Sequence, residues 1–416
     1  MPEPYMDARL MKDRRAYEKF IADLDARGLI LWTRQPKEKV TAFFVKKKTG
    51  QLRMVVDARR VNAVFAAPPG VELCTAEGLS RIELDLGQEV GDEEWRGEAG
   101  SGQPIFAGSL DVKDCFYRLR LRRDLAEYFA LPPVRSSAFG HHLDDNDLGQ
   151  IWPCLAALPM GFSWSLFFAQ RINEFEVGRA PSLQGRKAAS DQSGPMRLRA
   201  AVGPSHFVYV DNVGVIGVVK KEVADILEQV DERLNSVGLA THERLSSDTQ
   251  LEALGVELDL EGKCTRLTAK RYWRLERGLE WALSRKKLSG AALESLVGHC
   301  TFAGLVIRQS LSIFNASYKF SRKLGECRGV LWPEVRAELA AFEGDPALAE
   351  CGLVASLEPD GGRDGCEPFR LRGGQCGVAS FPSHRAWAHA GEEPLPLVGR
   401  SCPAACRSRR LGSRGA

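Results

Sequence analysis

Two stretches of sequence decide the predicted fold: FAGSLDVKDCFYRLRL at residues 106–121 and HFVYVDNVGVIGVV at residues 206–219. Each begins as a run of apolar and β-branched residues, which is typical of a buried strand. The first run turns polar at Asp111. In the second, Asp211 and Asn212 interrupt the apolar residues, and both residue types tolerate the backbone of a tight turn. We therefore expect a hairpin with Asp211 at its tip.

Carboxylates at the ends of neighbouring strands can hold Mg²⁺, which keeps several waters and accepts substrate phosphates as its remaining ligands. A pair of such ions clamps the attacking and leaving oxygens of an in-line phosphoryl transfer. A single Asp at a strand end is more often a cap or turn residue. Asp111 and Asp211 therefore gain a functional meaning only from the order of the motifs around them.

The remaining pattern is that of a mixed α and β chain. Residues 41–56, TAFFVKKKTGQLRMVV, are two β-rich runs joined by Thr49-Gly50, which predicts a hairpin. Residues 178–204 are rich in Gly, Ser and Arg and predict an inserted surface loop. Apolar residues at helical spacing predict helices at 12–28, 223–237, 269–285 and 291–307.

Charge is unevenly distributed, although the net charge is only +3. Eight basic residues and two acidic ones lie between Lys37 and Arg60, a segment that suits either a polyanion or a solvated strand end. Between Ile82 and Glu98 seven acidic residues accompany one Arg, which favours a solvated loop.

Composition and length describe an ordinary globular protein. The 416 residues are 44% hydrophobic and 27% charged, which excludes wholesale disorder and collagen-like repeats. No apolar run approaches 18 residues, and the N-terminus has no apolar signal segment. We therefore expect an intracellular protein of two or three domains with mostly reduced thiols and no membrane partner.

Several motifs occur along the chain in a set order. They are FFVKKKTGQLRMVVDARRVN (43–62), SLDVKDCFYRLRL (109–121), LPMGFSWS (158–165), YVDN (209–212), and GLATHE with LGVELD (238–243 and 254–259). With these motifs in this order, the chain resembles over about residues 5–324 the reverse transcriptase (RNA-directed DNA polymerase) of a retroelement, as a fragment of a larger polyprotein.

The resemblance implies an α+β fold of the right-hand polymerase type. Residues 1–108 would form the fingers with an N-terminal helix, and 109–262 a palm built on an antiparallel sheet. Residues 263–330 would form a helical thumb, and 331–416 a connection remnant with an irregular tail.

The resemblance also implies an active site. Asp111, Asp211 and Asn212 would be catalytic, with Asp111 and Asp211 as ligands of two Mg²⁺ ions, or of Mn²⁺. The side chains and backbone groups that bind the dNTP would be Lys47, Arg53, Val112, Asp114, Cys115, Phe116, Met160 and Gly161.

Individual members of that set have distinct expected roles. Lys47 and Arg53 would grip the triphosphate, because Lys is a compact charge and Arg a bidentate fork. Phe116 would exclude a ribose 2′-hydroxyl, which favours DNA synthesis over RNA synthesis. Gly161 would let the backbone approach the nucleotide and the template closely.

A basic helix face is the expected contact with nucleic acid. Lys270, Arg274 and Arg277 are spaced i, i+4 and i+7, which suits the phosphates of an RNA–DNA hybrid. A solubilising surface face is the alternative. The implied function is DNA synthesis from dNTPs on an RNA template with a DNA primer.

Some positions depart from the family pattern. Asn212 stands where the family has a second Asp, Met160 replaces a Gln, and Leu166 replaces a Pro. No Lys follows Gly238-Leu239, where the family often has a general acid, and His242 or Arg244 are the candidate substitutes. These departures support an alternative function, a catalytically impaired retroelement relic that binds nucleic acid without polymerising.

The C-terminal region has a different character. Residues 357–372, LEPDGGRDGCEPFRLR, can be encoded so that a shift of one nucleotide yields a strand resembling the start of a ribonuclease H-like domain. We therefore expect a frameshift somewhere after Leu339. The spacing of His384, His389, Cys402 and Cys406 fits no standard zinc site.

Overall fold

The computed structural model describes residues 5–47, 50–84, 104–140, 149–199, 202–247, 250–344, 351–352 and 354–355. All of them belong to the first of two units, Met1–Gly361 and Gly362–Ala416. Lys48, the acidic run from residue 85 onward and the tail from residue 356 lie outside the described residues.

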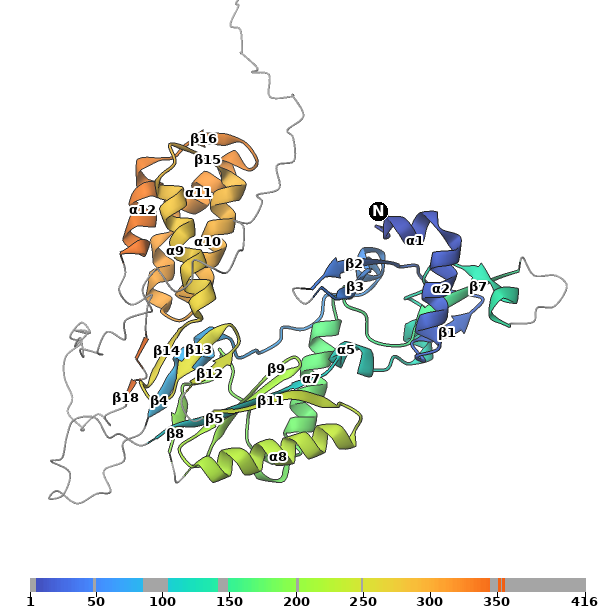
Figure 1. Cartoon of the computed structure of the whole chain (residues 1–416), viewed down its shortest axis with the longest axis horizontal. Helices are drawn as coiled ribbons and strands as arrows, with labels where there is room; N and C mark the ends of the chain where they lie inside the picture. Colours follow the sequence, from blue (N-terminus) through green and yellow to red (C-terminus); the bar gives the residue numbers. More distant parts are fainter. Residues whose placement is uncertain are drawn as a thin grey trace, which may run out of the picture. The chain divides into compact units, whose positions relative to one another are not determined.

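Helices occur along the whole described chain (Figure 1). The α-helices are α1 (Ala8–Lys12), α2 (Arg14–Asp25), α3 (Arg59–Val64), α4 (Ala76–Ser80), α5 (Cys115–Arg118), α6 (Arg123–Ala126), α7 (Ser165–Val177), α8 (Lys220–Ser236), α9 (Ala269–Leu283), α10 (Gly290–Gly304), α11 (Asn315–Leu324) and α12 (Pro333–Glu343). The 3₁₀ helices are η1 (Ser136–Phe139), η2 (Pro181–Leu183) and η3 (Arg308–Ile313).

The strands form several small sheets. They are β1 (Ile30–Thr33), β2 (Thr41–Lys46), β3 (Leu52–Asp57), β4 (Ile82–Leu84), β5 (Phe106–Val112), β6 (Val134–Arg135), β7 (Gln150–Leu155), β8 (Met196–Leu198), β9 (Ser205–Tyr209), β10 (Asn212–Gly217), β11 (Thr241–Ser247), β12 (Gln250–Ala253), β13 (Val256–Asp259), β14 (Cys264–Leu267), β15 (Lys287–Ser289), β16 (Arg328–Val330), β17 (Cys351–Gly352) and β18 (Val354–Ala355).

One antiparallel sheet, in the order β11-β5-β10-β9, contains the strands from the two stretches 106–121 and 206–219. The strands β5 and β10 are in the middle of this sheet and are almost entirely buried. The helices α7 and α8 pack against the sheet (Figure 1). Because α8 buries Val223, Ile226, Leu227, Val230 and Leu234 at helical spacing, it presents one continuous apolar stripe to its neighbours.

A second apolar core lies around the C-terminal helices. The helices α9, α10, α11 and α12 pack as a bundle (Figure 1), and the rings of Phe314 and Phe342 lie 4.8 Å apart between their centroids. Glu338 of α12 accepts the backbone N–H groups of Ala316 and Ser317 and so caps α11. The bundle therefore includes α12, which lies beyond the range 263–330 that the resemblance assigns to the thumb.

Most predicted elements are confirmed. The hairpin at 41–56 is β2 paired with β3. The helices predicted at 223–237, 269–285 and 291–307 are α8, α9 and α10. The first predicted helix is α2, which ends at Asp25, with the short α1 before it. Among the described residues, no helix has the length and apolar character needed to cross a membrane.

The prediction of a surface loop for residues 178–204 is wrong at η2 and β8, which are regular elements within it. Strand β8 pairs in parallel with β4, whose residues 82–84 also lie within the segment predicted as a solvated loop. Ala180 and Leu183 are fully buried. Isolated residues hold this segment against the rest of the chain. It therefore has no periodic pattern of apolar residues from which its structure could be predicted.

Asp191 is one of these anchors. Its carboxylate accepts hydrogen bonds from the backbone N–H groups of Thr75 (2.8 Å) and Gly78 (2.9 Å) and from the Thr75 hydroxyl (2.7 Å). It thereby satisfies donors at the start of α4, more than 100 residues earlier in the chain.

We predict that Asp191→Ala lowers the free energy of unfolding by about 2–3 kcal/mol, because two buried N–H groups lose a charged acceptor. Chemical denaturation measures the loss. Asp124→Ala is the control, since Asp124 is exposed and pairs with exposed Arg122, and its loss should cost less than about 1 kcal/mol. Equal effects in the two variants would show that residues 178–204 are not anchored through Asp191.

Candidate active site

Four polar side chains form a row across the central sheet. Asn212 of β10 pairs with Tyr209 of β9 on one side and with Asp111 of β5 on the other. Asp111 in turn pairs with His242 of β11. Directly opposed residues of adjacent strands project from the same face of a sheet, so these four side chains share one face.

Asp211 lies at the tip of the β9–β10 hairpin, as predicted. The turn consists of Val210 and Asp211, and Val210 has a φ of +56°. A positive φ at the first turn residue suits a type II′ turn, in which Gly is favoured. For a β-branched residue such as Val this conformation is strained by about 1–3 kcal/mol.

Two buried amides of α7 hold this strained residue. Gln170 accepts the N–H of Val210 (2.7 Å) and donates to the carbonyl of Val208 (2.9 Å). Asn173 donates to the carbonyl of Val210 and approaches the Cys115 sulfur at 3.5 Å. Both amides are at most 1% exposed. Helix α7 therefore fixes the hairpin tip and links it to the segment that follows Asp111.

The two aspartates disfavour each other's charge. Burial and the negative charge of Asp211 raise the pKa of Asp111 to about 6, although nearby His242 opposes the shift. Burial also raises the pKa of Asp211, and the positive charges of Arg53 and His242 act against that shift. Carboxylates crowded in this way are stabilised by any cation that comes between them.

The donor set suits Mg²⁺. Two carboxylates are available, Asp111 in β5 and Asp211 in the β9–β10 turn, and the Asn212 Oδ1 atom is buried without a hydrogen-bond partner in the described structure. Mg²⁺ takes one or two carboxylates and completes its shell with water and substrate phosphates. Within the described ranges, no group of three or more His, Cys, Asp and Glu side chains could hold a metal ion.

The chain turns sharply after Asp111. The N–H of Val112 donates to the Asp211 carbonyl at 2.7 Å and joins the two aspartate segments directly. Asp114 takes a left-handed φ of +53° and precedes the short helix α5, which begins at the buried Cys115. Phe116 is partly buried and packs against the main apolar core.

Lys47 and Arg53 lie on the β2–β3 hairpin. Arg53 pairs with Val45, and the N–H of Lys47, just after β2, donates to the carbonyl of Gln51 at 2.7 Å. The positive charge of Arg53 reaches Asp211, since it opposes the rise in the pKa of that carboxyl. Arg53 therefore acts on Asp211, whereas Lys47 lies at the hairpin end.

Gly161 lies very close to the backbone of Val56. It has a φ of +122°, and a Cβ atom at this position would overlap the Val56 carbonyl oxygen. The N–H of Val56 donates to the carbonyl of Met160 at 2.8 Å. Asn62 closes the turn, donating to the Gly161 carbonyl (2.9 Å) and accepting the N–H of Ser163 (2.9 Å).

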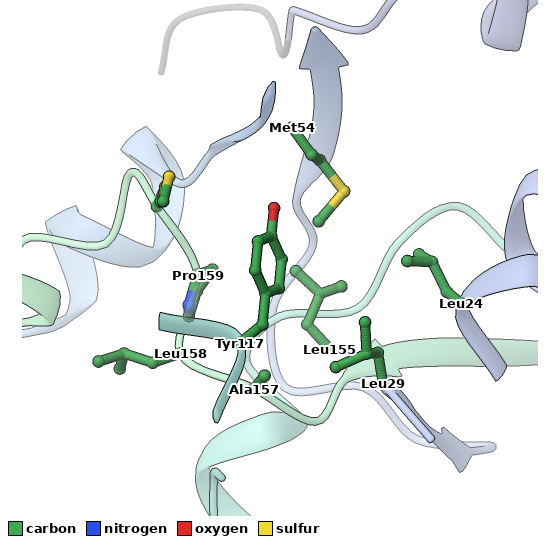
Figure 2. A pocket seen from close by; sticks show the side chains of 9 residues that line it. Leu24, Leu29, Met54, Tyr117, Leu155, Ala157, Leu158 and Pro159 are labelled. Carbon is green, nitrogen blue, oxygen red and sulfur yellow. The ribbon is translucent and has the colours of Figure 1, made fainter. Parts of the chain in front are cut away.

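Met160 also lines a small apolar pocket. Figure 2 shows the Tyr117 ring at its centre, with Met54 and Leu155 on one side and Pro159 on the other. The pocket volume of about 10 Å³ holds no more than about one water molecule. Its walls join Met54 of β3 to Tyr117 of α5, so it is a small gap in the packing between these two segments.

The predicted basic face of α9 is exposed at all three positions, Lys270, Arg274 and Arg277. The neighbouring guanidinium of Arg271 lies 4.0 Å from the centroid of the Phe302 ring on α10. Burial and the charges of Arg274 and Arg271 lower the pKa of His299 on α10. Arg271 and Arg274 of α9 therefore lie near α10 and give the seam between the two helices positive charge.

Sequence reasoning missed the residues that support the site. The sequence contained one signal for Gln170 and Asn173. Both are polar amides within the largely apolar helix SLFFAQRINEF, and residues of this type are usually exposed. Asn62 was visible only as the last letter of a motif. Of the two candidate substitutes for a general acid, Arg244 pairs with Glu228 at 2.7 Å, whereas His242 contacts Asp111.

We predict that Asp111→Asn stabilises the metal-free protein at pH 8 by about 1–2 kcal/mol, because it removes a charge that folding disfavours. The pKa of Asp111 rises from 3.8 to about 6 on folding. The ionised Asp111 carboxylate therefore destabilises the unchanged protein above pH 6, and this destabilisation disappears as the pH falls towards 4. Thermal unfolding at pH 8, 6 and 4 measures this difference, and a gain independent of pH would contradict the assignment.

We predict that Gln170→Leu, which preserves side-chain size, lowers the free energy of unfolding by about 2–4 kcal/mol. The reason is that the N–H of Val210 and the carbonyl of Val208 lose their partner inside the core. Arg171→Leu on the exposed face of α7 is the control. If both variants unfold at the same denaturant concentration, Gln170 does not hold the turn.

Comparison with known proteins shows similarity of fold alone. No protein-family model and no curated protein sequence matches the chain. A foamy viral protease-reverse transcriptase dRH solved with double-stranded DNA has a TM-score of 0.55 at 16% identity, covering 85% of this chain and 51% of that one. The foamy viral protease-reverse transcriptase solved with double-stranded DNA gives 0.52 and 16%, covering 86% and 62%.

The same viral protein solved with an RNA/DNA hybrid gives a TM-score of 0.52 at 15% identity, covering 85% of this chain and 39% of that one. This chain thus spans about half the length of the solved proteins that it resembles. At such identities the similarity establishes that the chain has a reverse-transcriptase-like fold.

Proposed function

We propose that the protein is a reverse transcriptase that synthesises DNA from dNTPs on an RNA template. The observation that carries the proposal is the register of β5 and β10, which sets Asp111 opposite Asn212 with Asp211 at the adjoining turn. The fold shared with viral reverse transcriptases supports it independently.

Asp111 and Asp211 hold the divalent cations in this proposal, and the Asn212 amide oxygen lies beside them as a neutral donor. Two Mg²⁺ ions, or Mn²⁺, would there activate the primer 3′-hydroxyl and neutralise the pyrophosphate that leaves. The buried amides of α7 hold the backbone of the turn that carries Asp211, and such preorganisation lowers the cost of cation binding.

The nucleotide is held by the groups around this pair. Arg53 and Lys47 bind the triphosphate from the β2–β3 hairpin, and the charge of Arg53 already reaches Asp211. The segment from Val112 to Cys115, with Met160 and Gly161, lines the nucleotide position. Phe116 faces the sugar and excludes a 2′-hydroxyl.

The template–primer hybrid lies along the basic seam of α9 and α10 in this proposal. Lys270, Arg274 and Arg277 contact phosphates, which makes binding independent of sequence and sensitive to salt. In the terms of the polymerase fold, the β2–β3 hairpin belongs to the fingers, the β11-β5-β10-β9 sheet to the palm, and the α9–α12 bundle to the thumb.

A second candidate function is a relic that binds nucleic acid without polymerising. Asn212 favours it, because the site has two carboxylates where the family pattern supplies a third. Loss of one negative charge beside two divalent cations weakens their binding.

Primer extension by the full chain tests the proposal. The assay supplies a DNA primer on an RNA template with dNTPs or rNTPs, in Mg²⁺ or Mn²⁺. We expect extension with dNTPs that falls at least about 10³-fold in Asp111→Ala. Asp225→Ala, an exposed aspartate on α8, is the matched control and should extend as the unchanged protein does.

The result separates the two functions. If the unchanged chain is inactive and Asn212→Asp extends the primer, the protein is a polymerase disabled at one ligand. If neither extends while both bind the hybrid in a mobility-shift assay, the relic is correct and the proposal fails.

A further inference from the structure

Strand β11 contains one extra residue beside Asp111. His242 pairs with Asp111, and the next pair joins Leu245 to Ser109. Three steps along β11 thus match two steps along β5, which is a β-bulge. Glu243 accommodates the extra residue with a φ of +53°, a left-handed conformation that is unfavourable for a non-glycine residue.

The bulge decides which side chain meets Asp111. If β11 had no bulge, the pairing of Leu245 with Ser109 would place Glu243, two residues before Leu245, opposite Asp111. A further carboxylate would then join Asp111 and Asp211, where burial and repulsion already disfavour negative charge. The bulge shifts the register by one residue and places the imidazole of His242 there instead.

The contact that results is well formed. His242 Nε2 lies 2.9 Å from Asp111 Oδ1, and the side chains are 37% and 28% exposed. His242 Nδ1 lies 3.6 Å from the Glu243 carboxylate, too far for a hydrogen bond. The imidazole therefore contacts Oδ1 of Asp111 and not Oδ2.

We propose that His242 is a positioning residue for Asp111, whose hydrogen bond to Oδ1 fixes the carboxylate so that Oδ2 is presented to a divalent cation. Carboxylates that bind metals are themselves held by outer hydrogen bonds, and loss of such a partner weakens metal affinity. The inference rests on the proposed function only in that the cation is the one polymerisation requires.

Direct Mn²⁺ binding tests the role of His242 without any turnover. Electron paramagnetic resonance measures free Mn²⁺ during titration of the full chain, with no nucleotide or nucleic acid present. We expect His242→Ala to weaken Mn²⁺ binding about 10- to 100-fold. His242→Gln retains an N–H donor and should recover binding to within about 3-fold of the unchanged protein.

Two controls separate positioning from other effects. Glu243→Gln removes the neighbouring charge and keeps His242, so it should change Mn²⁺ binding by less than about 3-fold. Metal-free thermal unfolding of both His242 variants checks that each is folded at the titration temperature. Unchanged or tighter binding by His242→Ala, or a loss in Glu243→Gln as large as in His242→Ala, overturns the proposal.

These outcomes are independent of polymerase activity. A chain that extends no primer but loses Mn²⁺ in His242→Ala and regains it in His242→Gln refutes the proposed function and supports the role of His242. A chain that extends primers with Mn²⁺ binding unaffected by His242→Ala supports the proposed function and refutes that role.

Discussion

The pairing of β5 with β10 is the constraint on which the candidate site depends. Both strands are buried almost throughout, so their register is fixed by the core and not by the polar residues at their ends. Asp111 and Asp211 are consequently forced together whether or not a cation is present. Repulsion of this kind destabilises the folded chain, and it persists because the apolar cores on both sides of the sheet contribute far more than it costs.

Strain and its compensation are found on both sides of this pair. Val210 and Glu243 each take a left-handed backbone conformation, one at the hairpin tip and one in β11. The first is held through both of its backbone groups by amides of α7. The second sets the face on which His242 lies. Unfavourable conformations thus flank the aspartates where side-chain direction matters most, as is common in functional sites.

The sequence predicted the regular elements and the positions of the aspartates because both have local signals. Apolar periodicity identified α8, α9 and α10, and the polar interruption of an apolar run identified the hairpin at Asp211. Contacts between distant segments have no such signal: Asp191 caps a helix from a stretch that resembles a loop. The β11 bulge is equally hidden, because nothing in the letters GLATHE distinguishes His242 from Glu243 as the neighbour of Asp111. The assignments of substrate-binding residues and of the tail remain predictions.

The contact of Gly161 with Val56 has a mechanical consequence for the β2–β3 hairpin. Strand β3 is clamped near its end through Val56 and Asn62, whereas Val45 and Leu52 near the tip are largely exposed. A hairpin that is held at its base bends along its strands and does not rotate about the base as a rigid body. Arg53 lies three residues from Val56, whereas Lys47 lies opposite Gln51 nearer the tip, so bending of the hairpin would move Lys47 further than Arg53.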